Sequence, residues 1–395
     1  DAQVDVHGLL ATTADIADQD FLAGRYHFSA PSPNTDASVV NQGLITIGQH
    51  GFGGLVAPHV RNSGVITGRL GQVVIAGAPT FTLDYYGDGL IQFAATSKVT
   101  ESSDTSRPLV QSDGTISVDG GDILITANAA ASVVEEVINT SGVVEAHSFA
   151  VEDGVIVLLG GEEGTVNVAG RLDTSGAGPD ARGGSVDVLG DKVLIADSAH
   201  INTSGSAGGG TMHIGGDLHG EGERQAASQT VVMPGAQITA DATEAGDGGQ
   251  IVVWADDSAS IHGEISARGG AESGDGGFIE TSGKNHLNLT STPDASSPNG
   301  DGGEWLIDPA DITIVQGSPP VISVAAIDFG TSIVYADLVN SALTNGTSVI
   351  MDTSTLVDDQ QGNITQNSDA TITMLNTVAE EAFTATLTMN ANNSL

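Results

Sequence analysis

Short runs in which apolar and polar residues alternate recur along most of the chain. Between Gly183 and Gly205 the runs "GGSVDVLG", "KVLIADS" and "HINTSG" follow one another, and the apolar side chains in each run alternate with polar ones. Such spacing is typical of short strands that bury one face. Helical spacing is nearly absent, and the main exception predicts a short helix near residues 335–344, just before the capping Gly346.

Glycine motifs recur at a nearly constant interval. The tetrapeptide Gly-Asp-Gly-Gly begins at Gly246, again at Gly274 and again at Gly300, so its two steps are nearly equal. The glycine pairs at 183–184 and 209–210 are separated by a similar step. The next step, from 209 to 248, is longer because it contains a polar segment, 219–229, which we interpret as an inserted loop. A fixed period within about 20–50 residues, with insertions confined to loops, indicates a solenoid.

The two patterns together predict an all-β fold, a parallel β-helix with about three short strands per coil and few small excursions. Coils stack about 4.8 Å apart, so at ~25 residues per coil the chain would form roughly sixteen coils. Asn41 and Asn62 occupy the same position in two matching segments, and we expect their amides to hydrogen-bond across one coil. Glycine pairs suit corners that need a positive φ, and the pairs expected there are Gly248, Gly249, Gly276, Gly277, Gly302 and Gly303.

Composition narrows the range of partners. Hydrophobic residues make up 39% of the 395 residues, enough for a continuous core, although aromatic residues make up only 4%. The 50 acidic and 11 basic residues give a formal net charge of −39, which repels nucleic acid and anionic lipid. The absence of cysteine excludes disulfides, thiolate metal sites and a cysteine nucleophile. We therefore expect an acidic, elongated protein that does not bind nucleic acid.

One position of the repeat carries a carboxylate in three successive coils, in Asp247, Asp275 and Asp301. Like charges about 5 Å apart are unfavourable unless they are neutralised. Ca²⁺ would fit between them, with carbonyl oxygens of the corners as further ligands. The alternative is that the three are exposed turn residues with splayed side chains. Arg182 favours this alternative, because it precedes an earlier glycine pair where the later coils have a carboxylate.

No arrangement of residues predicts catalysis. The ten histidines show neither His-x-x-x-His nor His-Glu-x-x-His spacing, and there is no Gly-x-Ser-x-Gly or phosphate-binding loop. A β-helix also suggests an enzyme of the pectate lyase or galacturonase type, whose site combines acids with a basic residue. The nearest basic groupings are Arg171 with Arg182 and Arg268 with Lys284, and each is equally well explained as relief of acidic repulsion. We expect no enzyme, no catalytic residue and no cofactor-binding residue.

The segment "GGEWLIDPADITI", residues 302–314, resembles a signature of large exoproteins of the filamentous haemagglutinin family: Gly-Gly-x-Trp-Leu-hydrophobic-Asp-Pro-x-Asp-hydrophobic-Thr-Ile. Segments 4–29, 37–76 and 81–94 resemble the later half of the family's amino-terminal secretion domain. The resemblance runs in order along nearly the whole chain and is weakest over 100–165. The residues expected to have structural roles here are Trp305, Asp308 and Pro309, and both tryptophans, Trp254 and Trp305, are expected to pack inside the coils or at their ends.

The resemblance implies a right-handed parallel β-helix exported by two-partner secretion, through an outer-membrane transporter with periplasmic domains. Such a protein is secreted or lies on the surface of a Gram-negative cell. Residues 1–98 would form the later part of the secretion domain, 99–315 a repetitive β-helix with Gly-Asp-Gly-Gly corners, and 316–395 its continuation. The family's Asn-Pro-Asn-Gly-type motifs lie upstream of the matching segment. We therefore assign no transporter-recognition residue and expect an internal piece of a longer exoprotein.

Three functions fit such a rod. The leading hypothesis is an adhesin that binds a cell-surface or glycan receptor. The second is a subunit of a structural surface filament, in which rods form homo-assemblies end to end or side by side. The third is the stalk of a larger contact-dependent toxin. In all three cases the role of this chain is to project and bind rather than to catalyse.

Overall fold

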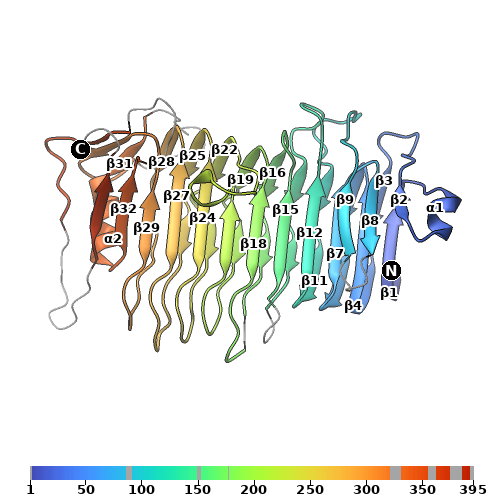
Figure 1. The fold of residues 1–395 in the computed structure, drawn as a ribbon, viewed down its shortest axis with the longest axis horizontal. Coiled ribbons are helices and arrows are strands. Elements are labelled where there is room, and N and C mark those ends of the chain that lie inside the picture. Colours follow the sequence, from blue (N-terminus) through green and yellow to red (C-terminus); the bar gives the residue numbers. More distant parts are fainter. Residues whose placement is uncertain are drawn as a thin grey trace.

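The chain forms a parallel β-helix, as the alternation and the repeat predict. The computed structural model describes residues 2–85, 91–148, 153–176, 178–320, 331–354, 362–373 and 385–391. In Figure 1 the strands lie side by side along the long axis of the molecule, from β1 (Gln3–Thr12) near one end to β32 (Ser348–Asp352) near the other.

Each regular coil contributes three short strands, one to each of three faces. The first face is a 12-stranded sheet that contains, in spatial order, β3 (Ser38–Asn41), β5 (His59–Asn62), β10 (Val110–Ser112), β13 (Ile138–Thr140), β16 (Thr165–Val168), β19 (Lys192–Ile195), β22 (Gln229–Val232), β25 (Ser258–Ile261), β28 (His286–Leu289), β31 (Ile333–Tyr335), β30 (Ile312–Val315) and β33 (Ile364–Gln366). The second face contains β6 (Val65–Arg69), β11 (Thr115–Asp119), β14 (Val143–Glu145), β17 (Arg171–Asp173), β20 (His200–Asn202), β23 (Gln237–Thr239) and β26 (Glu264–Ser266).

The third face is a long row of strands and later carries the candidate site. It contains β7 (Gln72–Gly77), β12 (Asp122–Ala127), β15 (Val155–Leu159), β18 (Ser185–Leu189), β21 (Thr211–Ile214), β24 (Gln250–Ala255), β27 (Phe278–Gly283), β29 (Glu304–Ile307), β32 and β34 (Leu387–Asn390). β1 and β4 (Leu44–Ala57) are long enough to bend from the second face into the third, because β4 pairs with β6 through its first residues and with β7 through its last.

The core is built from ladders of aliphatic side chains that point inward on every coil. Ile123, for example, lies in register between Val73 and Ile156, and all three are at most 2% exposed. Burying one such side chain contributes roughly 1.5–3 kcal/mol. Because the ladder repeats along the axis, each coil gains most of its stability from the coil before and the coil after.

The number of coils is lower than the sequence predicted. The first face has twelve strands among the described residues, against the roughly sixteen coils expected at ~25 residues per coil. Val110 pairs with Ile138 on one side and with Val60 on the other. The sequence separation from Val110 to Ile138 is that of a regular coil, whereas the separation from Val60 to Val110 is almost twice as long. The difference arises because long excursions leave the helix and consume residues without adding a coil.

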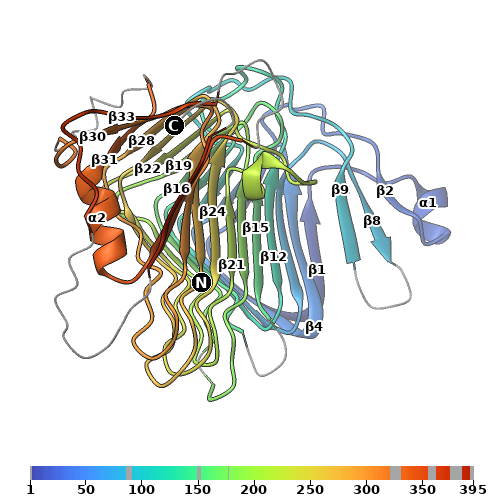
Figure 2. The same cartoon turned by 60° about the vertical axis from the view of Figure 1, so that its left-hand side comes forward.

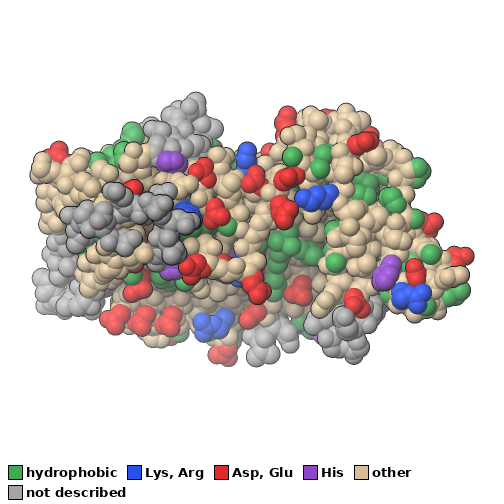
Figure 3. All heavy atoms as spheres, turned by 45° about the horizontal axis from the view of Figure 1, so that its top comes forward, with side chains coloured by type: hydrophobic (Ala, Val, Ile, Leu, Met, Phe, Trp, Pro, Cys, Tyr) green, Lys and Arg blue, Asp and Glu red, His purple; other side chains and the backbone are tan. Residues whose placement is uncertain are grey.

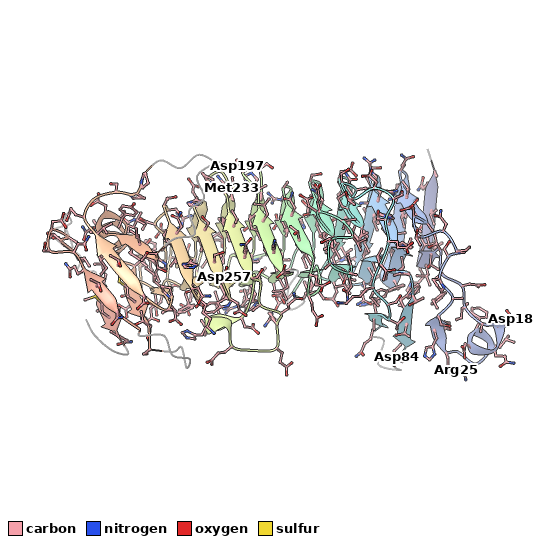
Figure 4. The ribbon with its side chains drawn as sticks, turned by 90° about the horizontal axis from the view of Figure 1, so that it is seen from above. Asp18, Arg25, Asp84, Asp197, Met233 and Asp257 are labelled. Atoms are coloured by element: carbon pink, nitrogen blue, oxygen red, sulfur yellow. The ribbon has the colours of Figure 1, made fainter. Side chains whose placement is uncertain are left out.

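Two of these excursions pack together on the N-terminal part of the rod. An antiparallel sheet of β2 (Tyr26–Phe28), β8 (Phe81–Tyr85) and β9 (Ile91–Ala95) lies outside the coils, near the short helix α1 (Asp18–Leu22) (Figure 2). Phe81 stacks between Phe28 and Phe93, with ring centroids 4.5 and 5.5 Å away, and forms a second small core. Asp18, Arg25 and Asp84 all lie on this side of the rod (Figure 4).

The winding is not strictly sequential near the C-terminal end. β31 lies between β28 and β30 in the first face, although β30 comes before it in the sequence. The helix α2 (Ala336–Thr344) follows β31 directly, within the range where the sequence predicts a helix, and buries Leu338 and Val339 against the core. In the described part of the chain, no helix is long and apolar enough to cross a membrane.

Candidate functional site

The surface of the rod is strongly acidic, and most of its basic side chains contact acids. Figure 3 shows acidic side chains spread over the visible face with few basic ones between them. Arg268 and Arg171 belong to the basic groupings that a sugar-binding site would use. Arg268 Nη2 lies 2.6 Å from Asp241 Oδ2, and Arg171 contacts Asp173. These contacts are of the kind expected from relief of acidic repulsion.

The three repeated aspartates form a ladder along one corner of the helix. The backbone N–H of Asp275 donates to Asp247 Oδ1 at 2.8 Å, and the backbone N–H of Asp301 donates to Asp275 Oδ1 at 2.8 Å. One oxygen of each of the first two carboxylates therefore already links its coil to the next coil. These links give the ladder a structural role that needs no ion, and the Ca²⁺ site stays a prediction.

The glycine pairs at the same corner are needed for space and not for a positive φ. Positive φ occurs at Gly246 and Gly274, the first residues of two of the tetrapeptides, and at none of the six paired glycines expected to have it. A Cβ on Gly276 would lie 1.8 Å from the carbonyl oxygen of Ala295. The same crowding applies to the other five, Gly248, Gly249, Gly277, Gly302 and Gly303, where a Cβ would lie 1.7–2.2 Å from a backbone oxygen of a neighbouring segment.

The asparagine ladder joins the first coils. Asn41 and Asn62 are register partners on β3 and β5, and the side-chain amide of Asn41 donates to Asn62 Oδ1 at 2.8 Å. Asn62 is fully buried and Asn41 is 7% exposed. The pair therefore satisfies polar groups inside the stack that would otherwise lack a partner.

The Trp-Leu-Ile-Asp-Pro motif contributes both to the core and to the outer side of the third face. Trp305 is fully buried in the main core, and its indole N–H donates to Thr281 Oγ1 at 2.8 Å. Asp308 points to the other side, is fully buried as well, and its backbone N–H donates to Ser282 Oγ at 3.0 Å. Pro309 is buried directly after it.

The second tryptophan is buried outside the main core. Trp254 is 1% exposed, and its indole N–H donates to Asp256 Oδ1 at 2.9 Å. It lies beneath the residues 215–228, which we call the covering loop, and atoms of its ring lie 2.8 and 2.5 Å from where a Cβ on Gly216 or Gly220 would be. The turn η1 (Leu218–Gly220) of this loop lies over β24 (Figure 2). The inserted segment predicted from the sequence thus serves as a lid over one strand of the third face.

The covering loop also brings three ionisable side chains together on the third face. His219 Nδ1 lies 2.7 Å from Asp308 Oδ2, and the backbone N–H of His219 donates to Glu280 Oε2 at 3.1 Å. Burial raises the pKa of Glu280 to about 7. Burial lowers the pKa of His219, but the hydrogen bond to Asp308 and the nearby carboxylates of Glu280 and Glu221 together outweigh this effect and raise it above its ordinary value. The sequence marks the inserted segment and the Asp-Pro motif separately but does not join them, because His219 is far along the chain from both of its partners.

A second cluster of similar composition lies on and beside the second face. His147 Nδ1 is 3.0 Å from Asp119 Oδ1, and its Nε2 is 3.7 Å from Asp173 Oδ2. Arg171 contacts Asp173 and places its Nε 3.8 Å from Glu145 Oε1. Contact with Asp173 is the main cause that raises the pKa of His147 to about 9. Burial raises the pKa of Asp173, but His147 and Arg171 help to outweigh it and lower this pKa to about 2.

Comparison with known proteins points to secretion. No protein-family model and no curated protein matches the chain. Among solved structures, the chain is similar to the crystal structure of the HMW1 secretion domain from Haemophilus influenzae, with 28% sequence identity and a TM-score of 0.60. The match covers 78% of this chain and 76% of that one. Over most of its length, the chain is similar to a secretion domain in both sequence and fold.

Proposed function

We propose that this chain is part of a rod-shaped exoprotein that leaves the cell by two-partner secretion through an outer-membrane transporter. The observation that carries the proposal is the likeness to the HMW1 secretion domain over 78% of the chain. The Trp-Leu-Ile-Asp-Pro signature also supports it, because residues 302–314 resemble a motif of the filamentous haemagglutinin family.

The physical properties of the chain suit this route. Contacts between neighbouring coils alone allow the helix to fold coil by coil as it emerges, and this folding biases movement outward. A net charge of −39 keeps the unfolded chain soluble before export, and the lack of cysteine avoids disulfides that would block a narrow pore. The destination of such a chain is the medium or the outer face of the cell.

Export is tested by expressing the protein in a Gram-negative host with and without a two-partner secretion transporter. The amount of protein outside the cell is then measured by immunoblotting. We expect the protein outside the cell only when the transporter is present. Equal release without the transporter contradicts the export route.

For the activity outside the cell we propose adhesion without catalysis, with a cell-surface or glycan receptor as the partner. The supporting feature is the shape: flat faces repeated along a rod present a long surface for binding and project it away from the cell. The 50 acidic residues far outnumber the 11 basic ones, and basic side chains such as Arg268 are already engaged with acids, so the surface is strongly negative. A receptor with basic or neutral polar groups therefore suits this surface better than an anionic one.

Adhesion is tested by measuring binding of the purified chain to cells and to immobilised glycans, after size-exclusion chromatography has isolated the monomer. We expect saturable binding that weakens as the salt concentration rises. A regular assembly in electron micrographs without cell binding favours the structural filament, whereas inhibition of neighbouring cells by the full exoprotein favours the toxin stalk. Either result overturns the adhesin proposal.

A further inference from the structure

Two carboxylates of the third face are buried beside a single imidazole, that of His219. Glu280 and Asp308 are both fully buried beneath the covering loop. Removing an ionised carboxylate from water is costly unless it is paired with a cation or coordinates a metal. Glu280 Oε1 is buried and has no hydrogen-bond partner, so one ligand position of the cluster is left unused by the protein.

The geometry of the cluster brings one nitrogen and two oxygen ligands together. One ligand atom each from His219, Glu280 and Asp308 lies within 4.8 Å of the others. A Zn²⁺ ion binds such atoms at about 2.0–2.2 Å, so a small closing movement of the cluster is enough to place all three in its first coordination sphere. The hydrogen bond between His219 Nδ1 and Asp308 Oδ2 would then be replaced by two bonds to the ion.

We propose that His219, Glu280 and Asp308 form a binding site for one divalent transition-metal ion, of which Zn²⁺ is the best match, and that the ion fastens the covering loop to the third face. An imidazole with two carboxylates suits Zn²⁺ and related ions, whereas Ca²⁺ and Mg²⁺ prefer oxygen ligands alone. The side chain of His219 is 28% exposed, which leaves room for entry of the ion and for water as a fourth ligand.

The second cluster provides a natural comparison. Glu145, His147 and Asp173 also bring one ligand atom each within 4.8 Å of the others. There, however, the guanidinium of Arg171 contacts Asp173 and lies near Glu145, so the acids already have a positive partner. We therefore expect an ion at the covering loop and none at the second cluster.

The direct test is calorimetric titration of the full chain with Zn²⁺ at neutral pH, in excess Mg²⁺ that saturates weak sites on the acidic surface. We expect one strong site per chain. Glu280→Gln and His219→Asn should each weaken Zn²⁺ binding more than about tenfold. Loss of a residue that only supports a metal ligand already lowers metal affinity by at least about tenfold. Asparagine is chosen at position 219 because it tolerates the left-handed backbone there, where φ is 58°. His147→Gln is the matched control and should leave the site unchanged.

A second readout follows the covering loop itself. Arg224 is the only basic cleavage site for trypsin within residues 215–228, so cutting there reports how firmly the loop is held. We expect Zn²⁺ to slow this cut in the wild type and in His147→Gln but not in Glu280→Gln. Circular dichroism of each variant establishes that the β-helix is intact. Absence of strong Zn²⁺ binding in the wild type, binding that survives Glu280→Gln, or binding lost in His147→Gln overturns the proposal.

Discussion

Single buried polar side chains hold successive coils in register. Asn62 accepts a hydrogen bond from Asn41 in the coil before, and its own amide donates to the carbonyl of Thr115 at 3.4 Å. The aspartate ladder links coils in the same way at an exposed corner. A change of one residue can therefore loosen two coils at once.

We predict that Asn62→Ala destabilises the first coils. The substitution leaves the buried amide of Asn41 without its acceptor, which costs about 1–3 kcal/mol. Hydrogen–deuterium exchange is the appropriate measurement because coils of a repeat protein can open locally. Backbone amides of β3 and β5 should exchange roughly 5- to 150-fold faster, whereas Gln111→Ala, an outward substitution on the neighbouring β10, should change little. Equal effects of the two substitutions argue against the ladder.

The pair of His147 and Asp173 predicts a pH dependence of stability. The pKa of His147 is raised in the folded state to about 9, so the stability it contributes is complete below its unfolded pKa of about 6.5 and is lost as the pH rises through 9. The pKa of Asp173 is lowered to about 2, so its contribution is complete above about 3.9 and is lost as the pH falls through 2. Both contributions are therefore complete between about pH 4 and pH 6.5.

The measurement is the free energy of unfolding of the wild type and of His147→Gln between pH 5 and pH 10. The wild type should be the more stable of the two at the acidic end, and the difference should shrink as the pH passes 9. Because the side chain of His147 is 35% exposed, water screens the interaction and the difference is modest. A difference that stays constant over this range contradicts the assignment.

At the scale of elements, the stacked corners set how closely the coils approach. In each Gly-Asp-Gly-Gly tetrapeptide the last two residues form the glycine pair. A side chain at any of these six paired positions would clash with the backbone of an adjacent segment. The covering loop shows a similar crowding, because Gly216 and Gly220 lie against the ring of Trp254. Corners and loops thus use glycine where two backbones, or a backbone and a ring, come into contact.

We predict that Gly276→Ala is strongly destabilising and that Gly8→Ala is not. A Cβ at Gly276 would lie 1.8 Å from the carbonyl oxygen of Ala295, whereas a Cβ at Gly8 would meet nothing within 4 Å. Overpacking of this kind typically costs about 1–3 kcal/mol. Both changes reduce the entropy of the unfolded chain equally, so the difference between their thermal unfolding curves isolates the steric cost. Similar melting temperatures for the two variants exclude a steric role for the corner.

The alternation of apolar and polar residues predicted the regular strands well. It could not predict where the chain departs from the regular winding. The runs between Gly183 and Gly205 became β18, β19 and β20, because alternation reports which side chains face a shared core. The position of β31 between β28 and β30 depends on which neighbouring strands it pairs with. The alternation of apolar and polar residues does not determine that pairing. The prediction that the paired glycines have positive φ was wrong. Glycine is needed there because backbone from another part of the chain leaves no room for a Cβ, and the local sequence does not show that backbone.

The candidate site was only partly accessible from the sequence. The Trp-Leu-Ile-Asp-Pro motif marked Asp308, and the length of one repeat step marked the covering loop, but nothing joined the two. Glu280 occupies an outward position of β27, where the sequence alone predicts a solvated side chain. In the structure it is buried and accepts a hydrogen bond from His219 of the covering loop. A site formed between an inserted loop and distant coils can be recognised only from the three-dimensional structure.

At the scale of the whole molecule, the shape and the charge are consistent with the proposed export route. The twelve described strands of the first face stack into a continuous rod, and its main core runs from Ile45 to Ala370. Nearest-neighbour contacts make the folding of one coil the template for the next. The proposal that folding outside the cell promotes export therefore requires that an early coil be able to form.

The most direct test places a defect in such a coil, at Ile45. This residue is 7% exposed and lies in register between Val4 and Ile66, so proline there removes a ladder hydrogen bond and disrupts the stack. The amount of exoprotein outside the cell is measured for the wild type, for Ile45→Pro and for the conservative Ile45→Val, each with the transporter present and with periplasmic levels followed in parallel. We expect Ile45→Pro to accumulate inside the cell while Ile45→Val is exported normally, whereas normal surface levels of Ile45→Pro contradict export driven by coil-by-coil folding.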